Sequence, residues 1–409
     1  MVNEEIQQGF RAYDRFLSHY RTSGHYEALR SLKMMYALHM RVVERKKALF
    51  PVKQLLRLAG KVLVLPFTKM RLVGRNTDCV VLECYATMEQ DCFPADPPGI
   101  VALRRFWALN PEWMGILIRF FKAAVLLLGT DRLKRGRVVA LLHRLLDYYH
   151  VHRTLEFQGI KTVFMENDRF PTHKALIDKA RLAGVKTVKF DYWLIDAINH
   201  NDVYCDCYFY PNRYHRDIIE TFSQVEELTY ISGGFPNFDR LAQLRRSVDE
   251  NAPVVYFTQP DIPFDEQARY IRDIARFAKD RGLIVKVHPR DDTRRYEDLR
   301  SERIVLGAAG SDSYRLLESG AMFFSVFSTI SLEAKHLSPY AFFINYDKDG
   351  HRYPVDYERL GLDLIDSEAA LEALFQGRLE VSSSESFIAR FNPAYPHTVE
   401  MMLEVCRHA

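Results

Sequence analysis

Several features that would assign a protein to a class at once are missing from this sequence. Its six cysteines include no CxxC pair, which argues against a structural zinc site. The chain has no low-complexity tract and no internal repeat, so neither a disordered chain nor a repeat architecture is expected. What remains is the composition of an ordinary globular protein, with 48% hydrophobic and 27% charged residues.

A hydrophobic run long enough to cross a bilayer is also missing. Residues 114–129 form the most apolar window, but Arg119 and Lys122 interrupt it, and it is shorter than the ~20 residues that a membrane-spanning helix needs. The first residues do not have the pattern of a signal peptide. We therefore expect a cytoplasmic protein. It is expected either free in the cytoplasm or attached peripherally to the inner membrane.

The cysteines are expected to be reduced. They lie in strand-like or helical contexts, at Cys79, Cys84, Cys92, Cys205, Cys207 and Cys406. Cys205 and Cys207 are two positions apart, so in a strand both thiols point to one face. Buried, reduced thiols are typical of a cytosolic protein.

The net charge of +3 is small, but the basic residues are unevenly placed. Between Arg41 and Arg75 ten basic residues accompany a single acid, Glu44. Such a block beside apolar residues favours an anionic surface, either lipid headgroups or a charged glycan. A solvated helix that packs on the body of the protein is the alternative. No nucleic-acid partner is expected.

With 409 residues the chain exceeds one typical core, so two α/β domains are expected. We predict a helical basic region over residues 1–75, a first Rossmann-like acceptor domain over 76–246 and a second, nucleotide-donor domain over 253–409. The polar stretch 247–252 is predicted to link the two domains. The predicted fold is α/β, with two Rossmann-like domains facing a central cleft.

The strands of these domains are predicted from short apolar runs bounded by Gly or Pro. Helical segments between the runs predict right-handed βαβ crossovers and parallel sheets. The runs lie at residues 78–84, 160–165, 185–190, 205–210, 253–258, 283–287, 321–325 and 340–346. In such sheets ligands bind at the carboxyl ends of strands, so polar residues that follow the runs are candidate site residues.

His288 is the strongest single candidate. It follows the run 283–287, and Pro289 after it stops the strand and turns the imidazole out of the sheet. A histidine in this position can protonate or neutralise a leaving phosphate. A histidine held structurally in a loop is the alternative.

Ser328 and Thr329 follow the run 321–325 and are expected to begin a helix. The free N–H groups and the dipole of a helix N-terminus bind anions, although Ser and Thr also occur there simply as caps. Ser325 can add a hydroxyl at the strand end. Glu333, four residues after Thr329, is expected on the same helix face and can bind ribose hydroxyls or pair with Lys335 or an arginine.

Glu166 and Asp168 end a strand of the first domain. One of them is expected to act as general base toward an acceptor hydroxyl, facing His288 across the cleft. The alternative is a cap of the next helix, which Pro171 begins, and Asp168 is well placed for it.

These motifs resemble a known group of enzymes. The segments Phe257-Thr258-Gln259-Pro260, Val287-His288-Pro289 and residues 327–334 look like the C-terminal half of bacterial two-domain (GT-B) sialyltransferases and polysialyltransferases, with their HP and SS/ST motifs. The resemblance implies that His288 and Ser328-Thr329 hold the CMP phosphate, with His288 as general acid. It also places Thr258, Gln259, Pro289, Ser325 and Glu333 at the donor.

The same resemblance implies an acidic motif in the first domain that supplies the base. In that group the motif ends in glycine, whereas this chain has Glu166-Asn167-Asp168. The stretch 234–239, together with the HP and Ser-Thr elements, also resembles the CDP-polyol phosphotransferases of teichoic acid and capsule synthesis. Kdo transferases share parts of the layout.

From the residues and the resemblance we expect a metal-independent glycosyltransferase of bacterial capsule or lipopolysaccharide synthesis. It would transfer sialic acid or Kdo from a CMP donor to a glycan or lipid-linked glycan acceptor, with the nucleotide sugar as substrate and no other cofactor. The alternatives are a CDP-glycerol or CDP-ribitol polyol-phosphate transferase and a non-catalytic glycan- or lipid-binding assembly protein. The acidic pair Asp291-Asp292 is the one place where a bound metal ion would contradict the expectation of metal independence.

Overall fold

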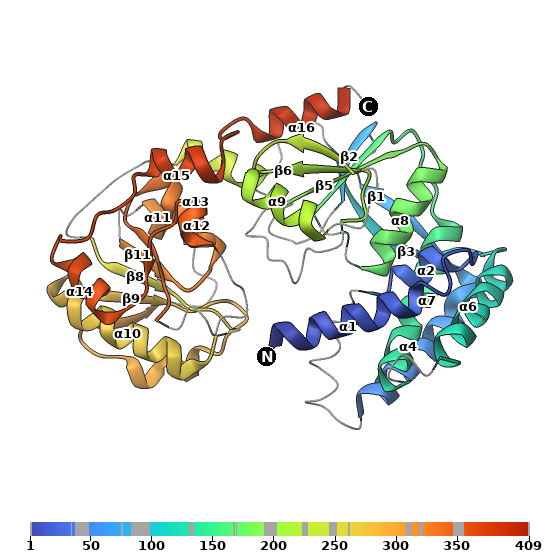
Figure 1. Cartoon of the computed structure of the whole chain (residues 1–409), viewed down its shortest axis with the longest axis horizontal. Helices are drawn as coiled ribbons and strands as arrows, with labels where there is room; N and C mark the ends of the chain where they lie inside the picture. Colours follow the sequence, from blue (N-terminus) through green and yellow to red (C-terminus); the bar gives the residue numbers. More distant parts are fainter. Residues whose placement is uncertain are drawn as a thin grey trace. The chain divides into compact units, whose positions relative to one another are not determined.

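The computed structural model forms two compact units, residues 1–233 together with 399–409, and residues 234–398. Each unit is described by itself below, and Figure 1 labels their elements. The structure describes residues 2–33, 35–36, 49–74, 77–82, 99–130, 135–166, 168, 170–191, 203–222, 228–244, 252–260, 262–307, 313–318, 322–346 and 356–407.

The first unit is built on a seven-stranded sheet in the order β1-β3-β2-β4-β5-β6-β7. Its strands are β1 (Thr68–Gly74), β2 (Cys79–Leu82), β3 (Gly99–Trp107), β4 (Thr162–Met165), β5 (Lys186–Phe190), β6 (Cys207–Tyr210) and β7 (Thr229–Ser232). All neighbours pair in parallel except β1 and β3, which are antiparallel. Strands β2 and β4 are buried throughout, as expected for a sheet with both faces covered.

Helices surround this sheet in the first unit. They are α1 (Val2–Leu17), α2 (Tyr26–Arg30), α4 (Leu49–Val64), η1 (Leu65–Phe67), α6 (Trp113–Leu128), α7 (Arg135–Thr154), α8 (Pro171–Leu182), α9 (Arg213–Phe222) and α16 (Thr398–Arg407). Helix α8 begins with Pro171, whose fixed φ suits a first helical position, and Gly184 adopts a positive φ just beyond its end. These boundaries agree with the expected βαβ rhythm.

The N-terminal region is part of the first unit. Tyr13, Phe16 and Leu29 are buried in the same apolar core as α6 and α7, and the Tyr13 hydroxyl donates to the Leu29 carbonyl at 2.7 Å. The expectation of helix up to residue 75 is wrong for Thr68–Gly74, which forms β1 and pairs with β3. A strand at the edge of a sheet carries charged side chains such as Arg71, so its pattern resembles that of a helix face.

The C-terminal helix returns to the first unit, so the domain boundaries differ from the predicted ones. In α16 the side chain of Met402 is fully buried against Phe164, Val188 and Phe209 of the first sheet. Cys406 of this helix forms a disulfide with Cys79 of β2, which corrects the expectation of reduced thiols for this pair. The two cysteines are 327 positions apart, so no local pattern revealed the pair.

Cys205 and Cys207 carry free, buried thiols, in agreement with the prediction. Burial raises the pKa of both thiols above the ordinary value, which keeps them protonated. Cys84 and Cys92 lie outside the described residues.

The second unit has a six-stranded parallel sheet in the order β10-β9-β8-β11-β12-β13. Its strands are β8 (Val254–Phe257), β9 (Leu283–Lys286), β10 (Ile304–Gly307), β11 (Met322–Ser325), β12 (Ala341–Ile344) and β13 (Leu364–Ile365). Its helical segments are η2 (Pro236–Gln243), α10 (Phe264–Ala278), η3 (Lys279–Arg281), η4 (Thr293–Leu299), α11 (Ser313–Glu318), α12 (Thr329–Leu337), α13 (Tyr357–Leu360), α14 (Glu368–Phe375) and α15 (Ser384–Phe391). The prediction of two parallel α/β domains is confirmed.

A buried carboxyl group, that of Asp178, links three helices of the first unit. Asp178 of α8 accepts hydrogen bonds from the hydroxyls of Tyr148 in α7 and of Tyr204, whose hydroxyl also donates to Glu27 of α2. Burial raises the pKa of Asp178 to about 6, against an ordinary 3.8. The folded protein therefore binds this proton more tightly than the unfolded chain does.

We predict a pH-dependent stability that Asp178→Asn removes. The stabilising effect of the bound proton is fully present below pH 3.8 and is lost as the pH rises through about 6. This shift corresponds to about 3 kcal/mol. Urea unfolding at pH values from 4 to 7, monitored by hydrogen exchange in the first unit, measures the free energy of unfolding. Over this pH range the wild type should lose about this amount more than Asp178→Asn does. The surface variant Glu156→Gln should show the same pH dependence as the wild type. If Asp178→Asn also showed the wild-type pH dependence, the assignment to Asp178 would be contradicted.

Candidate functional site

The topology of the second sheet marks one place for a ligand. From β8 the chain proceeds to β9 and β10 on one side, and it returns to β11, β12 and β13 on the other. The strand order therefore reverses between β8 and β11, and ligands of open parallel sheets bind beside the carboxyl ends of strands at this switch point. The segments that follow β8, β9 and β11 contain most of the predicted donor residues.

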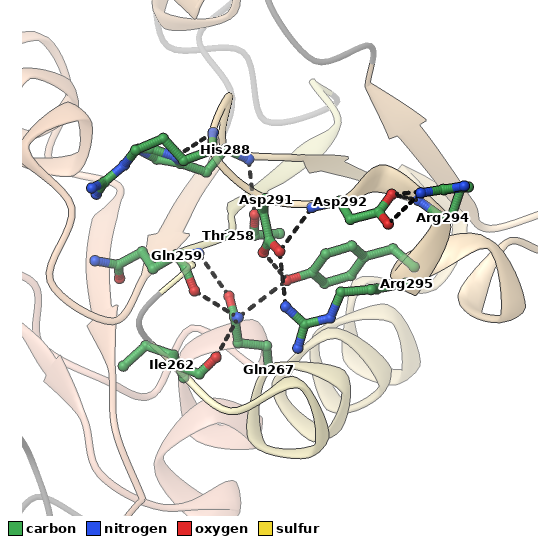
Figure 2. Close-up of polar contacts among 11 residues, drawn as sticks. Thr258, Gln259, Ile262, Gln267, His288, Asp291, Asp292, Arg294 and Arg295 are labelled. Carbon is green, nitrogen blue, oxygen red and sulfur yellow. Dashed lines mark hydrogen bonds and ion pairs between the residues drawn. The ribbon is translucent and has the colours of Figure 1, made fainter. Parts of the chain in front are cut away.

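His288 lies in a tight turn at the carboxyl end of β9 (Figure 2). The Asp291 N–H donates to the His288 carbonyl at 2.8 Å, and Pro289 occupies the second position of this turn, which its fixed φ favours. Thr258, which follows β8, accepts the His288 N–H through its side-chain oxygen at 2.9 Å. The backbone of His288 is thus held by the neighbouring strand.

The ring of His288 is oriented as well. Its Nδ1 accepts the backbone N–H of Arg290 at 3.1 Å, so in the neutral imidazole the hydrogen sits on Nε2. The residue is only half-buried. His288 is therefore arranged to present an N–H donor on the side of the ring that faces away from its own turn.

Gln259 connects the end of β8 to the segment between β11 and α12. Its side-chain oxygen accepts the N–H groups of Val326 at 3.1 Å and of Phe327 at 2.8 Å. Gln259 is itself held, because its backbone N–H donates to Oε1 of Gln267 at 2.8 Å and its carbonyl accepts from Nε2 of Gln267 at 2.9 Å. One amide therefore fixes the path by which the chain enters α12.

A chain of hydrogen bonds continues from Gln267 to the turn after β9 (Figure 2). Gln267 Nε2 donates to the Tyr296 hydroxyl at 3.1 Å, and this hydroxyl donates to Asp291 at 2.6 Å. Arg295 pairs with the same carboxylate at 2.9 Å, while Asp292 accepts the Arg294 N–H and begins η4. Both aspartates of the suspected metal position thus hold the loop in place.

Helix α12 begins at the switch point with Ser328 as its N-cap. The Ser325 hydroxyl oxygen accepts the Ser328 N–H at 3.1 Å and receives a hydrogen bond from the Ser331 hydroxyl at 2.7 Å. The next N–H groups, of Thr329 and Ile330, belong to the first turn, which a helix cannot satisfy internally. Ser328 and Thr329 are half-buried, whereas Ser325 is fully buried. The arrangement suits an anion at Thr329 and Ile330.

Glu333 has an arginine partner, which was one of the two expectations. It is 5% exposed, and its Oε1 lies 3.5 Å from a terminal nitrogen of Arg240 in η2. The segment before η2 approaches its surroundings closely, because a Cβ on Gly234 would lie 2.5 Å from the side-chain oxygen of Asn392. Arg240 directly follows the stretch 234–239 that carries one of the sequence resemblances, and it brings an arginine to α12.

The two predicted acids lie at the carboxyl end of β4 in the first unit, beside the reversal of strand order between β2 and β4. The N-cap of α8 is Phe170, so Asp168 does not cap this helix. The Asp168 carboxylate instead accepts the Tyr204 N–H at 2.6 Å. Buried Lys189 lies 3.7 Å from Asp168 and 3.3 Å from Asp191, and it donates to the Glu166 carbonyl at 2.9 Å.

The structure thus brings His288, Thr258, Gln259, Ser325 and Ser328 together through hydrogen bonds within the second unit. Glu166 and Asp168 share the Lys189 cluster of the first unit. The prediction that the acids face His288 concerns both units, and it stays a prediction.

Sequence reasoning missed Gln267, Arg240 and Lys189. Gln267 lies on the inner face of the helix after β8, and a glutamine among apolar positions was a usable signal. Lys189 was another, because a lysine inside an otherwise apolar strand needs buried partners. Arg240 carried no comparable signal, since arginines are common near helix ends.

Comparisons with known proteins gave matches among solved structures alone. No protein-family model matches the sequence, and no curated protein matches it. The wall teichoic acid polymerase TagF is 12% identical, with 64% of this chain and 75% of that chain covered and a TM-score of 0.39.

Two further matches show similar levels of likeness. For the UDP-N-acetylglucosamine 2-epimerase from Rickettsia bellii the identity is 15%, the coverage 65% and 79%, and the TM-score 0.46. For UGT89C1 from Arabidopsis thaliana, complexed with UDP-L-rhamnose, the values are 11%, 61%, 72% and 0.39. At such identities and TM-scores the matches carry no conclusion about donor, acceptor or reaction.

We predict that Lys189→Met destabilises the first unit by about 3–5 kcal/mol, because it leaves buried carboxylates without a counter-charge. Chemical unfolding of the variant and the wild type measures this loss. Lys186→Met, in the same strand but partly exposed, is the matched control. A loss no larger than that of Lys186→Met would contradict the role of Lys189 as the buried partner of these carboxylates.

Proposed function

We propose that this protein is a transferase that uses a cytidine-nucleotide donor, with a CMP-activated sugar such as sialic acid or Kdo as the first candidate. The observation that carries the proposal is the assembly at the switch point of the second sheet. There His288, whose Nδ1 accepts the Arg290 N–H, follows β9, and the first turn of α12 follows β11; β8 lies between these two strands. The sequence resemblance to CMP-sugar transferases rests on the same residues.

The chemistry assigns a task to each group. An acceptor hydroxyl attacks the anomeric carbon, the bond from that carbon to the phosphate oxygen breaks, and CMP leaves. His288 donates its Nε2 proton or a hydrogen bond to the leaving phosphate. The N-terminus of α12, with Ser328 and Thr329, binds the same phosphate. In this proposal these groups take the role that a divalent cation has in other transferases.

Glu166 is proposed as the base that takes the proton of the acceptor hydroxyl. Asp168 is already engaged by the Tyr204 N–H and lies beside Lys189, an arrangement that suits a fixed anion. Glu166 stands directly at the end of β4. The acceptor is proposed to be a glycan or lipid-linked glycan of a bacterial surface polysaccharide, because the resembling enzymes act on such acceptors.

A CDP-polyol phosphotransferase is the second candidate, and Arg240 favours it. In that reaction the hydroxyl attacks the β-phosphorus of the donor and CMP leaves, so two phosphates need binding partners. Arg240 stands next to α12 through its pair with Glu333, and it directly follows the stretch 234–239 that resembles these enzymes. Arginine is suited to phosphate recognition by its planar set of donors.

The choice of nucleotide can be measured first. We expect CMP or CDP to raise the melting temperature more than UDP or GDP does, since a ligand that binds only the folded state stabilises it by about 2.7 kcal/mol at a hundred times its Kd. A thermal-shift series with the four nucleotides makes the comparison. A clear preference for UDP or GDP would exclude both cytidine-donor candidates. Preference for CDP with loss of the effect in Arg240→Ala would favour the second candidate.

His288→Ala should reduce transfer from the donor so identified by roughly two to four orders of magnitude, because a positioned acid is worth that much. Folding should be unchanged, since the half-buried ring lies in a strand-end turn. Ser328→Ala with Thr329→Ala should instead mainly weaken donor binding, which equilibrium titration measures separately from turnover.

Arg294→Ala, an exposed residue of the segment that follows this turn, is the matched control for His288 and should retain activity. Glu166→Gln should lose turnover with donor affinity nearly unchanged. Near wild-type turnover of His288→Ala would contradict the proposed mechanism and favour a binding protein without catalysis.

A further inference from the structure

The exposed apolar side chains of the described residues are concentrated in one part of the first unit. Of the fourteen large apolar side chains that are exposed there, twelve lie between residues 55 and 128. Single exposed apolar residues are ordinary, but a gathering of them marks an interaction site. The two others, Leu182 and Val305, lie in other parts of the fold.

Helix α6 is apolar on its outer face as well as on its inner face. Its inner residues Ile116 and Phe120 are buried in the core, where α6 packs on α7. Its outer row repeats at intervals of four and three positions, and its members are Met114, Ile118, Phe121, Val125 and Leu128, between 38% and 67% exposed. An exposed row of apolar side chains on a helix whose inner face is already buried is normally covered by protein or lipid.

The outer row continues into a rigid corner. Phe67, Trp107 and Leu109 are 55%, 75% and 76% exposed. Their backbone is nevertheless fixed, because the Ala108 N–H donates to the Phe67 carbonyl at 3.0 Å and the Asn110 N–H to the Pro66 carbonyl at 2.9 Å. A tryptophan, a phenylalanine and a leucine are therefore exposed to solvent on a backbone that hydrogen bonds hold in place.

Helix α4 adds to this surface at its C-terminal end. It leads directly into η1, which carries Phe67, and its Leu63 is 74% exposed. Both α4 and α6 pack on α7 (Figure 1). We name the α6 outer row together with Leu63, Phe67, Trp107 and Leu109 the apolar face.

The charged residues of the segments that carry the apolar face are mostly basic, although two of them, Lys61 and Arg105, are paired with Asp147 of α7. Residues 49–74 and 99–130 contain nine basic residues and one acid, Glu112, although the whole chain is nearly balanced with 56 basic and 53 acidic residues. Glu112 is paired with Arg153 at 2.8 Å, while Arg119 and Lys122 are exposed on α6 itself. A second copy of the same face would oppose these charges with like charges, so a symmetric dimer is disfavoured.

A mixed basic and apolar helix surface matches an anionic lipid layer. Within the described ranges no helix is long and apolar enough to cross a membrane, so α6 would lie along the surface. We propose that the apolar face docks on an anionic membrane, with the outer row of α6 at the boundary of the acyl chains. Trp107 then lies at headgroup level, and Arg119 and Lys122 contact lipid phosphates. This site overlaps the basic block expected at residues 41–75 at Leu63 and Phe67, whereas its main helix α6 lies outside that block; residues 41–48 and 75 lie outside the described residues.

The proposal is tested with the full chain and lipid vesicles, by sedimentation at several salt concentrations. The wild type should bind vesicles of phosphatidylcholine with phosphatidylglycerol, should bind pure phosphatidylcholine weakly, and should lose binding as salt rises. The triple variant Ile118→Ser, Phe121→Ser, Val125→Ser should bind about tenfold less or weaker still. Arg119→Gln with Lys122→Gln should lose affinity by roughly fivefold per charge and depend less on salt.

Leu182→Ser is the matched control, because Leu182 is 75% exposed in the same unit but lies outside the apolar face. It should bind as the wild type does. Circular dichroism and melting curves establish that each variant is folded, and Trp107→Ala gives a second, single-residue test should the triple variant misfold.

Three results would overturn the proposal. These are vesicle binding by the folded triple variant at the wild-type level, equal binding to neutral and anionic vesicles at all salt concentrations, and no vesicle binding by the wild type. If light scattering then shows an oligomer that the triple variant dissociates, the apolar face is a protein interface instead. Vesicle binding needs no donor or acceptor, so the outcome is independent of the proposed transfer reaction.

Discussion

The second unit depends on one buried amide. The side-chain oxygen of Gln259 accepts two successive backbone N–H groups, of Val326 and Phe327, and thereby closes the gap between β8 and the start of α12. The sheet reverses its order at this place, so the two segments are far apart in sequence and share no crossover connection. The Ser325 hydroxyl holds the same turn from within, through Ser328 and Ser331, whereas Gln259 ties the turn to the neighbouring strand. Gln267 fixes the amide from the other side, and the same chain of contacts continues to Asp291 in the turn that holds His288.

The strand-end residues were predictable from the sequence because they depend on local rules. A short apolar run followed by His288 and Pro289 predicts a strand that ends in a turn, and a run followed by Ser328 and Thr329 predicts a helix start. The role of Gln259 was not predictable, because its partners are neighbours only once the order β9-β8-β11 is known. Local pattern gives the elements, whereas the order of the strands decides which side chains meet.

The larger errors have the same origin. The return of α16 to the first unit rests on Met402 and on the Cys79–Cys406 pair, and both join residues that are far apart in the sequence, by 327 positions for the cysteines. The composition of α6 was visible in the sequence, with its apolar residues and the two cations Arg119 and Lys122. The sequence does not show that only one side of this helix is covered. Exposure is a property of the packed helices, so the apolar face became recognisable only in the structure.

The two units treat carboxylates differently, and the difference bears on which of them suits a phosphate. In the second unit Asp291 and Glu333 each have an arginine partner, so the charge of these carboxylates is locally balanced. An unpaired carboxylate there would repel a phosphate bound at the helix N-terminus. In the first unit buried Lys189 lies beside both Asp168 and Asp191, so these two carboxylates share a buried cation. Arginine partners that balance carboxylates locally suit the binding of an anion nearby.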